Sequence, residues 1–180
     1  VLCTVLAIVV GIYLSKTKAA KDARNTYIDN LTSIRETAMT GAITSEEVCI
    51  LTHDVWYNTI FEERDFDTNP YTQDASGSFN EDFNDSIKAL YADEDIKSKL
   101  SDIQSNRALV DAYMKRLQNP TEEFEDCYDT LDTMYDAYCG LTDLAASPSG
   151  SLTSYTESYR TYDTDFAKAW EKLATQIPEK

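Results

Sequence analysis

The sequence predicts an all-α protein, in which an N-terminal transmembrane helix precedes an elongated antiparallel helical bundle of three to four helices with coiled-coil-like packing. Apolar residues recur at steps of three and four from Asn25 almost to the end of the chain, which is the period of a helix. Only 5 Gly and 4 Pro are present, too few for an all-β chain that needs a turn every ~8–12 residues. A chain of 180 residues suffices for one domain with a core. We therefore expect a membrane anchor with a basic juxtamembrane segment (residues 1–24) and an acidic helical bundle domain (residues 25–180).

The first 24 residues have the pattern of a membrane anchor. The segment from Val1 to Leu14 carries no charge. Four basic residues follow it: Lys16, Lys18, Lys21 and Arg24. As a helix the segment covers about 21 Å, less than the ~30 Å hydrocarbon core, but the chain does not begin with Met and we expect the span to continue upstream. We expect a retained single-pass anchor in membrane lipid, with a cleaved signal peptide or a soluble core helix as alternatives.

The charge is unevenly distributed along the chain. The net charge of −16 divides into +3 for residues 1–24 and −19 for residues 25–180. Nucleic acid is excluded as a partner, because binding it requires many Lys and Arg residues to neutralise phosphates. Because large domains translocate largely regardless of flanking charge, we expect an extracytoplasmic bundle domain.

The first bundle helix is expected from about Arg24 to Glu63, with an apolar stripe that ends on Val55 and Ile60. Thr44 and Glu47 offer an alternative start for a new helix, as N-cap and capping-box residues. The segment "ERDFDTNPYTQDASGSFN" that follows is predicted to be the longest loop.

Three further helices are expected. The second uses apolar positions from Phe79 to Leu117, with a kink near residues 92–94 where the spacing changes. In the third, Asn119 suits the N-cap and Pro120 the first helical position, and Pro148 stops the helix. The last runs from Leu152 to Ile177 with the cleanest alternation of three- and four-residue steps.

Cys49 and His53 lie four residues apart, so on a helix both point from one face at the spacing of metal ligands. A zinc site would need two more ligands, from Cys127, Cys139 or a carboxylate of another helix. The competing interpretation, which we favour, is a core thiol beside a half-buried imidazole. Asp54 is expected to point about 100° away around the helix and to be a poor partner for His53.

The segment from Asp65 resembles the opening of a calcium loop, with Asp65, Asp67 and Asn69 at alternating positions. Pro70 then replaces the turn glycine and Ser76 replaces the bidentate Glu. We therefore favour an acidic surface loop over calcium ligation of another kind. No cofactor is expected, with Ca and Zn as the weaker alternatives.

The cysteines allow one inference about a disulfide. Cys127 and Cys139 lie about 18 Å apart along one helix and cannot bridge each other. In an oxidising compartment Cys49 pairs with one of them across the bundle, and we choose Cys139. Free buried thiols are the equal alternative.

No catalytic motif is present, neither a phosphate-binding loop nor a nucleophile elbow nor a second histidine, so we expect no enzyme. The 12 Tyr and 2 Trp are many for a bundle. They either form a ligand groove near "VWYNTIF" and near Tyr155, Tyr159 and Tyr162, or are core residues with hydroxyls at the rim, which we favour.

An acidic stripe is predicted on the third helix. Its six carboxylates fall opposite the apolar side of the helical wheel: Glu122, Glu125, Asp126, Asp129, Asp132 and Asp136. Three of the pairs they form are like charges at i,i+4, each costing roughly 0.2–0.5 kcal/mol. Bound cations, a basic partner or simple solubility would each explain why the cost is tolerated.

Four stretches resemble a loose group of small bacterial membrane-anchored proteins of unknown function. They are the N-terminal span, "SEEVCILTHDVWYNTI", "NPTEEFEDCYDTLDTMYDAY" and "LAASPSGSLTSYTES". The resemblance implies a protein of the bacterial cell envelope and adds no activity. The first hypothesis is a binding module that presents an acidic, tyrosine-bearing surface to an unknown protein partner. A small-ligand sensor and a metal-binding bundle using Cys49 and His53 are the alternatives, and self-association is left open.

Overall fold

The computed structural model describes the backbone from Leu2 to Lys180 and the side chains from Ser15 onward. Within these residues the chain is helical, with one isolated bridge between Gln73 and Phe79, which confirms the predicted all-α class. The elements in order are α1 (Leu2–Phe61), α2 (Asn69–Thr72), α3 (Phe83–Ala92), α4 (Glu94–Leu117), the 3-10 helix η1 (Glu122–Phe124), α5 (Glu125–Ala146) and α6 (Leu152–Gln176).

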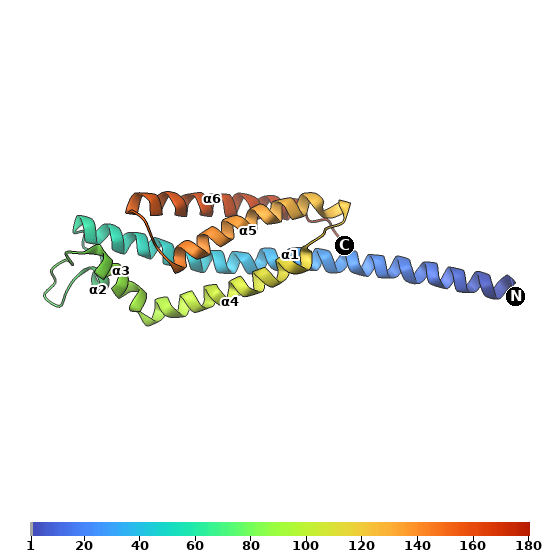
Figure 1. Cartoon of the computed structure of the whole chain (residues 1–180), viewed down its shortest axis with the longest axis horizontal. Coiled ribbons are helices and arrows are strands. Elements are labelled where there is room, and N and C mark those ends of the chain that lie inside the picture. Colours follow the sequence, from blue (N-terminus) through green and yellow to red (C-terminus); the bar gives the residue numbers. More distant parts are fainter. Residues whose placement is uncertain (1) are drawn as a thin grey trace.

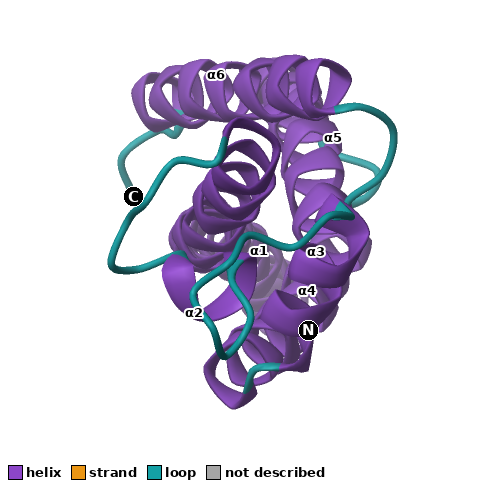
Figure 2. Cartoon of the chain, turned by 90° about the vertical axis from the view of Figure 1, so that its left-hand side faces the viewer, coloured by secondary structure: helices purple, strands orange, loops and turns teal. Residues whose placement is uncertain are grey.

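The long helices form an antiparallel, up-down-up-down bundle (Figure 1). Helix α1 runs the length of the molecule, with α4 on one side and α6 on the other. Helix α5 packs on α6 and on α1, whereas α4 and α6 make no contact with each other in the described part of the chain. The view onto the end of the bundle gives the same order, with α6 at the top and α4 toward the bottom (Figure 2).

The C-terminal tail returns to α1 at the point where α1 leaves the bundle. The Arg24 guanidinium donates to the carbonyl of Glu179 at 3.1 Å, and Lys180 forms an ion pair with Asp29. The part of α1 before Arg24 projects beyond the other helices (Figure 1). No helix in the described residues is both long and apolar enough to cross a membrane. The predicted anchor spans Val1 to Leu14, and the side chains of these residues lie outside the part of the chain that the structure describes.

One face of each long helix enters a single core, as the apolar periodicity predicts. Leu31, Ile34 and Val48 of α1 are fully buried. The end of the α1 stripe was predicted wrongly, because Ile60 is 46% exposed and Thr59 is buried in its stead. The Thr59 hydroxyl donates to the carbonyl of Val55 at 2.7 Å, so the helix itself satisfies this polar group inside the core.

Helix α1 continues without a break through the alternative start at Thr44. The Thr44 hydroxyl donates backward to the carbonyl of Thr40 at 3.2 Å and does not cap a new helix. Ser45 does the same toward Gly41 at 2.8 Å. A Ser or Thr that bonds to the carbonyl four residues earlier stays inside a helix, so the predicted single helix through this region is confirmed and the alternative start is not used.

The third bundle helix begins later than predicted. Asn119 is not its N-cap but has a φ of 61°, and the helix starts as η1 behind Thr121. Pro120 disfavours the α conformation in the residue before it, and Asn tolerates the left-handed region better than most residues. The pair therefore turns the chain between α4 and α5.

The predicted kink near residues 92–94 is a complete helix boundary. Asp93 ends α3 and caps α4, with its carboxylate accepting from the backbone N–H groups of Asp95 at 2.9 Å and Ile96 at 3.4 Å. The negative charge also suits the positive end of the helix dipole.

Replacing Asp93 by alanine is expected to lower the free energy of unfolding by about 1 kcal/mol, because two N–H groups of α4 lose their acceptor. Urea titration followed by circular dichroism measures the change. Asp93→Asn keeps the acceptor and should stay within a few tenths of wild type. Equal losses in both variants would contradict the capping role.

Candidate functional site

The acidic stripe lies on the solvent side of η1 and α5. All six predicted carboxylates are exposed, from Glu122 to Asp136. Among the residues whose side chains are described, none of the six makes an ion pair. Their neighbour Glu123 does, with Arg24 at 2.7 Å. The stripe is therefore an uncompensated negative surface on a rigid helix.

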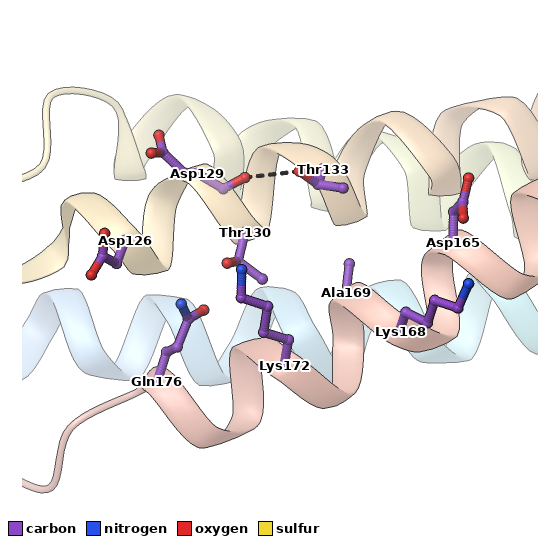
Figure 3. Close-up of a pocket in the computed structure, with 9 residues that line it drawn as sticks. All are labelled: Asp126, Asp129, Thr130, Thr133, Asp165, Lys168, Ala169, Lys172 and Gln176. Atoms are coloured by element: carbon purple, nitrogen blue, oxygen red, sulfur yellow. Dashed lines mark hydrogen bonds between the residues drawn. The ribbon is translucent and has the colours of Figure 1, made fainter.

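A groove of about 670 Å³ runs beside the stripe, between α5 and α6 (Figure 3). Its lining residues are Asp126, Asp129, Thr130, Thr133, Asp165, Lys168, Ala169, Lys172 and Gln176. Lys168 and Lys172 extend from α6 while Asp126 and Asp129 stand on α5. Neither lysine is paired with a carboxylate anywhere in the described side chains. The groove thus offers carboxylates on its α5 wall, and two ammonium groups and the carboxylate of Asp165 on its α6 wall.

A second groove, of about 840 Å³, lies where α1 ends and meets the following loop and α4. Three of the residues predicted as candidate metal ligands line it: His53, Asp65 and Asp67. Cys49 does not join them, because its side chain is fully buried in the core. The described residues contain no group of three His, Cys, Asp or Glu side chains arranged to hold a metal ion.

The imidazole of His53 is engaged by its neighbour. His53 Nδ1 lies 2.8 Å from Asp54 Oδ1, so the expectation that Asp54 is a poor partner was wrong. Both side chains are partly exposed and have room to bend toward each other along the helix surface. The imidazole ring also stacks on the ring of Tyr57, with the two ring centroids 6.0 Å apart.

The oxygens of the calcium-like segment are used in closing the loop. Asp65 Oδ1 accepts from the backbone N–H of Asp67 at 2.9 Å. Asn69 Oδ1 accepts from the N–H of Asp65 at 3.1 Å and from the Gln73 amide at 2.9 Å. These contacts build a local turn, which fits the acidic surface loop that we favoured.

The cysteines described by the structure are free thiols, so the Cys49–Cys139 disulfide is absent. Cys49 lies beside Tyr155 of α6, whose hydroxyl is 3.4 Å from the Cys49 carbonyl. Cys139 lies beside Arg107 of α4 and Tyr135. The two thiols face different neighbours, and the structure shows the free thiols that were the equal alternative.

Of the tyrosines that the sequence singled out, Tyr155 is buried, Tyr159 and Tyr162 are half-buried against the core, and Tyr57 is 41% exposed. Tyr138 and Tyr155 are at most 1% exposed. Burial raises the pKa of Tyr91 to about 12, and the Tyr91 hydroxyl donates to the carbonyl of Ala145 at 2.7 Å. The hydroxyls thus bond to backbone and side-chain groups, and the rings fill space between helices.

Alkaline pH is expected to destabilise the fold. Burial raises the pKa of the Cys49 thiol from 9.0 to about 11 and that of Tyr27 from 10.0 to about 12. The folded state therefore favours the protonated forms, and their contribution is complete below pH ~9 and is lost as pH rises toward ~12. Urea midpoints should be level from pH 7 to about 9 and then fall. A midpoint that stays level to pH ~12 would contradict this linkage.

Sequence reasoning missed an apolar surface on the outer side of α1. Ile43, Ile50, Tyr57 and Phe61 are between 41% and 56% exposed. Their spacing of seven, seven and four was visible in the sequence, but a second apolar stripe on one helix was not separated from the core stripe.

No family model matches the chain, and no characterised protein or solved structure is detectably similar to it.

Proposed function

We propose that this chain is a membrane-anchored, non-enzymatic interaction module of the bacterial cell envelope, which binds a basic protein partner through the acidic stripe of η1 and α5. The observation that carries the proposal is the stripe itself, with six exposed carboxylates and no ion pair to any described side chain. Packing of α5 on α6 and α1 holds the carboxylates in fixed register.

Electrostatics favours binding of a basic partner over the alternative that the carboxylates only keep the protein soluble. The bundle carries −19 in residues 25–180, and the stripe concentrates six of these charges on about four helical turns. Such a surface steers positive partners and speeds their association, more strongly at low salt. A basic partner would also relieve the like-charge pairs at 122/126, 125/129 and 132/136.

The anchor is proposed on the sequence of residues 1–24. An uncharged segment from Val1 to Leu14 is followed by Lys16, Lys18, Lys21 and Arg24. Because α1 is one continuous helix from Leu2 to Phe61, a membrane-embedded N-terminus would hold the bundle on a stiff rod. The ten residues from Ser15 to Arg24 would set it about 15 Å from the span. The extracytoplasmic side is part of the proposal.

The test compares the full chain with a neutralised variant, Asp126→Asn, Asp129→Asn, Asp132→Asn and Asp136→Asn. Affinity purification from native envelopes should recover a basic protein with wild type and lose it with the variant. Raising the salt concentration should release it. The matched control neutralises four exposed carboxylates elsewhere: Glu81→Gln, Asp85→Asn, Asp102→Asn and Glu157→Gln. A partner that the neutralised stripe retains, or recovery of no partner, would overturn the proposal.

A further inference from the structure

A second surface, on the outer side of α1, has the form of a docking groove. We define the α1 apolar stripe as Ile43, Ile50, Tyr57 and Phe61. Their exposed fractions are 48%, 43%, 41% and 56%, and the rings of Tyr57 and Phe61 lie 4.5 Å apart. The stripe covers eighteen residue steps of one straight helix, about 27 Å. Large apolar side chains that gather in one line mark an interaction site, while single ones do not.

The stripe lies on the exposed face of α1, between the flank that faces α4 and the flank that faces α6. On the first flank Glu47 forms an ion pair with Lys99 of α4. On the second flank Glu46 accepts a hydrogen bond of 3.2 Å from Tyr159 of α6. The exposed fractions of its four side chains show that no described element covers the stripe.

A hollow lies on each flank of the stripe. The groove of about 840 Å³ lies along Ile50 and Tyr57, between α1, α4 and the loop after α1. A smaller cavity of about 240 Å³ lies beside Ile43, between α1 and α6, and Phe166 and Trp170 line it. These hollows suit apolar side chains that project from a docked helix at steps of three, four and seven residues.

The rims of the two hollows are acidic. Five carboxylates border the larger groove against two cations, Arg64 and Lys99: Glu47, Asp54, Glu63, Asp65 and Asp67. Three more border the smaller cavity, with no cation among its lining residues: Glu46, Asp163 and Glu171. A second copy of this chain would bring another bundle of net charge −19 to the same rim. The charge therefore matches a basic occupant and opposes self-association.

We infer that the α1 apolar stripe docks a basic amphipathic helix of a partner protein, which lies along the exposed face of α1. The apolar face of that helix packs on Ile43, Ile50 and Tyr57, and its Lys and Arg residues flank it toward the acidic rim. The inference goes beyond the proposed function, because it assigns a different surface with apolar anchoring. The two surfaces lie on different helices and are separable by mutation.

The test uses the full chain in nanodiscs of zwitterionic lipid and a photoreactive peptide probe. The probe is a Leu/Lys amphipathic helix of about 18 residues, compared with a scrambled peptide of the same composition and a Leu/Glu counterpart. Binding is measured by fluorescence anisotropy, with empty nanodiscs as the blank, and crosslinks are mapped by mass spectrometry. We expect crosslinks on residues 43–61, and at least tenfold weaker binding of both control peptides.

The variant Ile50→Ser/Tyr57→Ser should weaken binding of the Leu/Lys peptide at least tenfold. Both side chains are half exposed, so the far-ultraviolet circular dichroism of the variant should match wild type. Leu109→Ser is the matched control, since Leu109 is 57% exposed on α4 and borders neither hollow. The variant in which Asp126, Asp129, Asp132 and Asp136 of α5 are replaced by Asn should bind the peptide like wild type.

Four outcomes would overturn the inference. They are equal binding by the Ile50→Ser/Tyr57→Ser variant, equal loss in the Leu109→Ser control, crosslinks confined to α5, and a dimer of the full chain that the same double substitution dissolves. A dimer of this kind would mean that a second copy of the chain covers the α1 apolar stripe. If peptide binding is lost only when the four α5 aspartates are replaced by Asn, this inference is wrong and the proposed function still stands.

Discussion

Replacing Gly41 by alanine is expected to destabilise the bundle by about 2 kcal/mol, although the same change in an open helix stabilises by about 1 kcal/mol. A Cβ atom at Gly41 would lie 2.3 Å from Asn106 Oδ1 and 2.7 Å from Tyr138 Oη. Neither atom is free to move aside. The Asn106 amide donates to the carbonyl of Thr37 at 3.0 Å, and the Tyr138 hydroxyl donates to Asn106 Oδ1 at 2.7 Å. Alanine therefore separates α1 from α4 and α5, or breaks a buried hydrogen bond.

Urea titration of Gly41→Ala at neutral pH measures this effect. Thr40→Ala, one residue away at an exposed position, is the control and should stay within about 0.5 kcal/mol of wild type. In the background of Asn106→Ala the penalty should shrink, since the nearest atom has been removed. A Gly41→Ala variant more stable than wild type would show that the helices do not approach as described.

Replacing Tyr155 by alanine is expected to cost about 3–5 kcal/mol, the usual penalty for removing a buried aromatic ring. Tyr155 is 1% exposed, near the start of α6, and its ring centroid lies 5.7 Å from that of Trp56 on α1. It helps to join the N-terminal half of α6 to α1.

Tyr155→Phe separates the ring from the hydroxyl. The hydroxyl is 3.4 Å from the carbonyl of Cys49, a long contact, so the variant should lose no more than about 1 kcal/mol. Thermal and urea unfolding of both variants provide the comparison. Equal losses in Tyr155→Phe and Tyr155→Ala would contradict the dominance of ring packing.

Helix positions followed from the sequence where apolar spacing and strong breakers agree. Helix α6 runs from Leu152 to Gln176, almost as predicted, and Pro148 lies in the turn before it. The starts of helices were harder to predict from cap residues, because Thr and Asn side chains such as those of Thr44 and Asn119 also occur in helix interiors and in turns. Only the surrounding chain decides, as the left-handed Asn119 before Pro120 shows.

The candidate site followed from the sequence in part. The exposure of the α5 carboxylates came directly from the helical wheel, since α5 is a regular helix with one buried face. The exposed apolar stripe of α1 did not, because it lies on the same helix as the core stripe and was not separated from it. The position of Cys49 in the core was expected, but its contact with Tyr155 was not, because that contact depends on the rotation of α1 against α6.

The central claim is that the α5 stripe contacts a basic protein, and site-specific photocrosslinking in native cells tests it most directly. A photoreactive residue at Thr133, exposed between the carboxylates, is compared with one at Leu109 on α4. We expect Thr133 to capture one basic protein, with at least tenfold less captured at Leu109 and in the neutralised stripe variant. Equal capture at both positions, or no capture at Thr133, would contradict the claim.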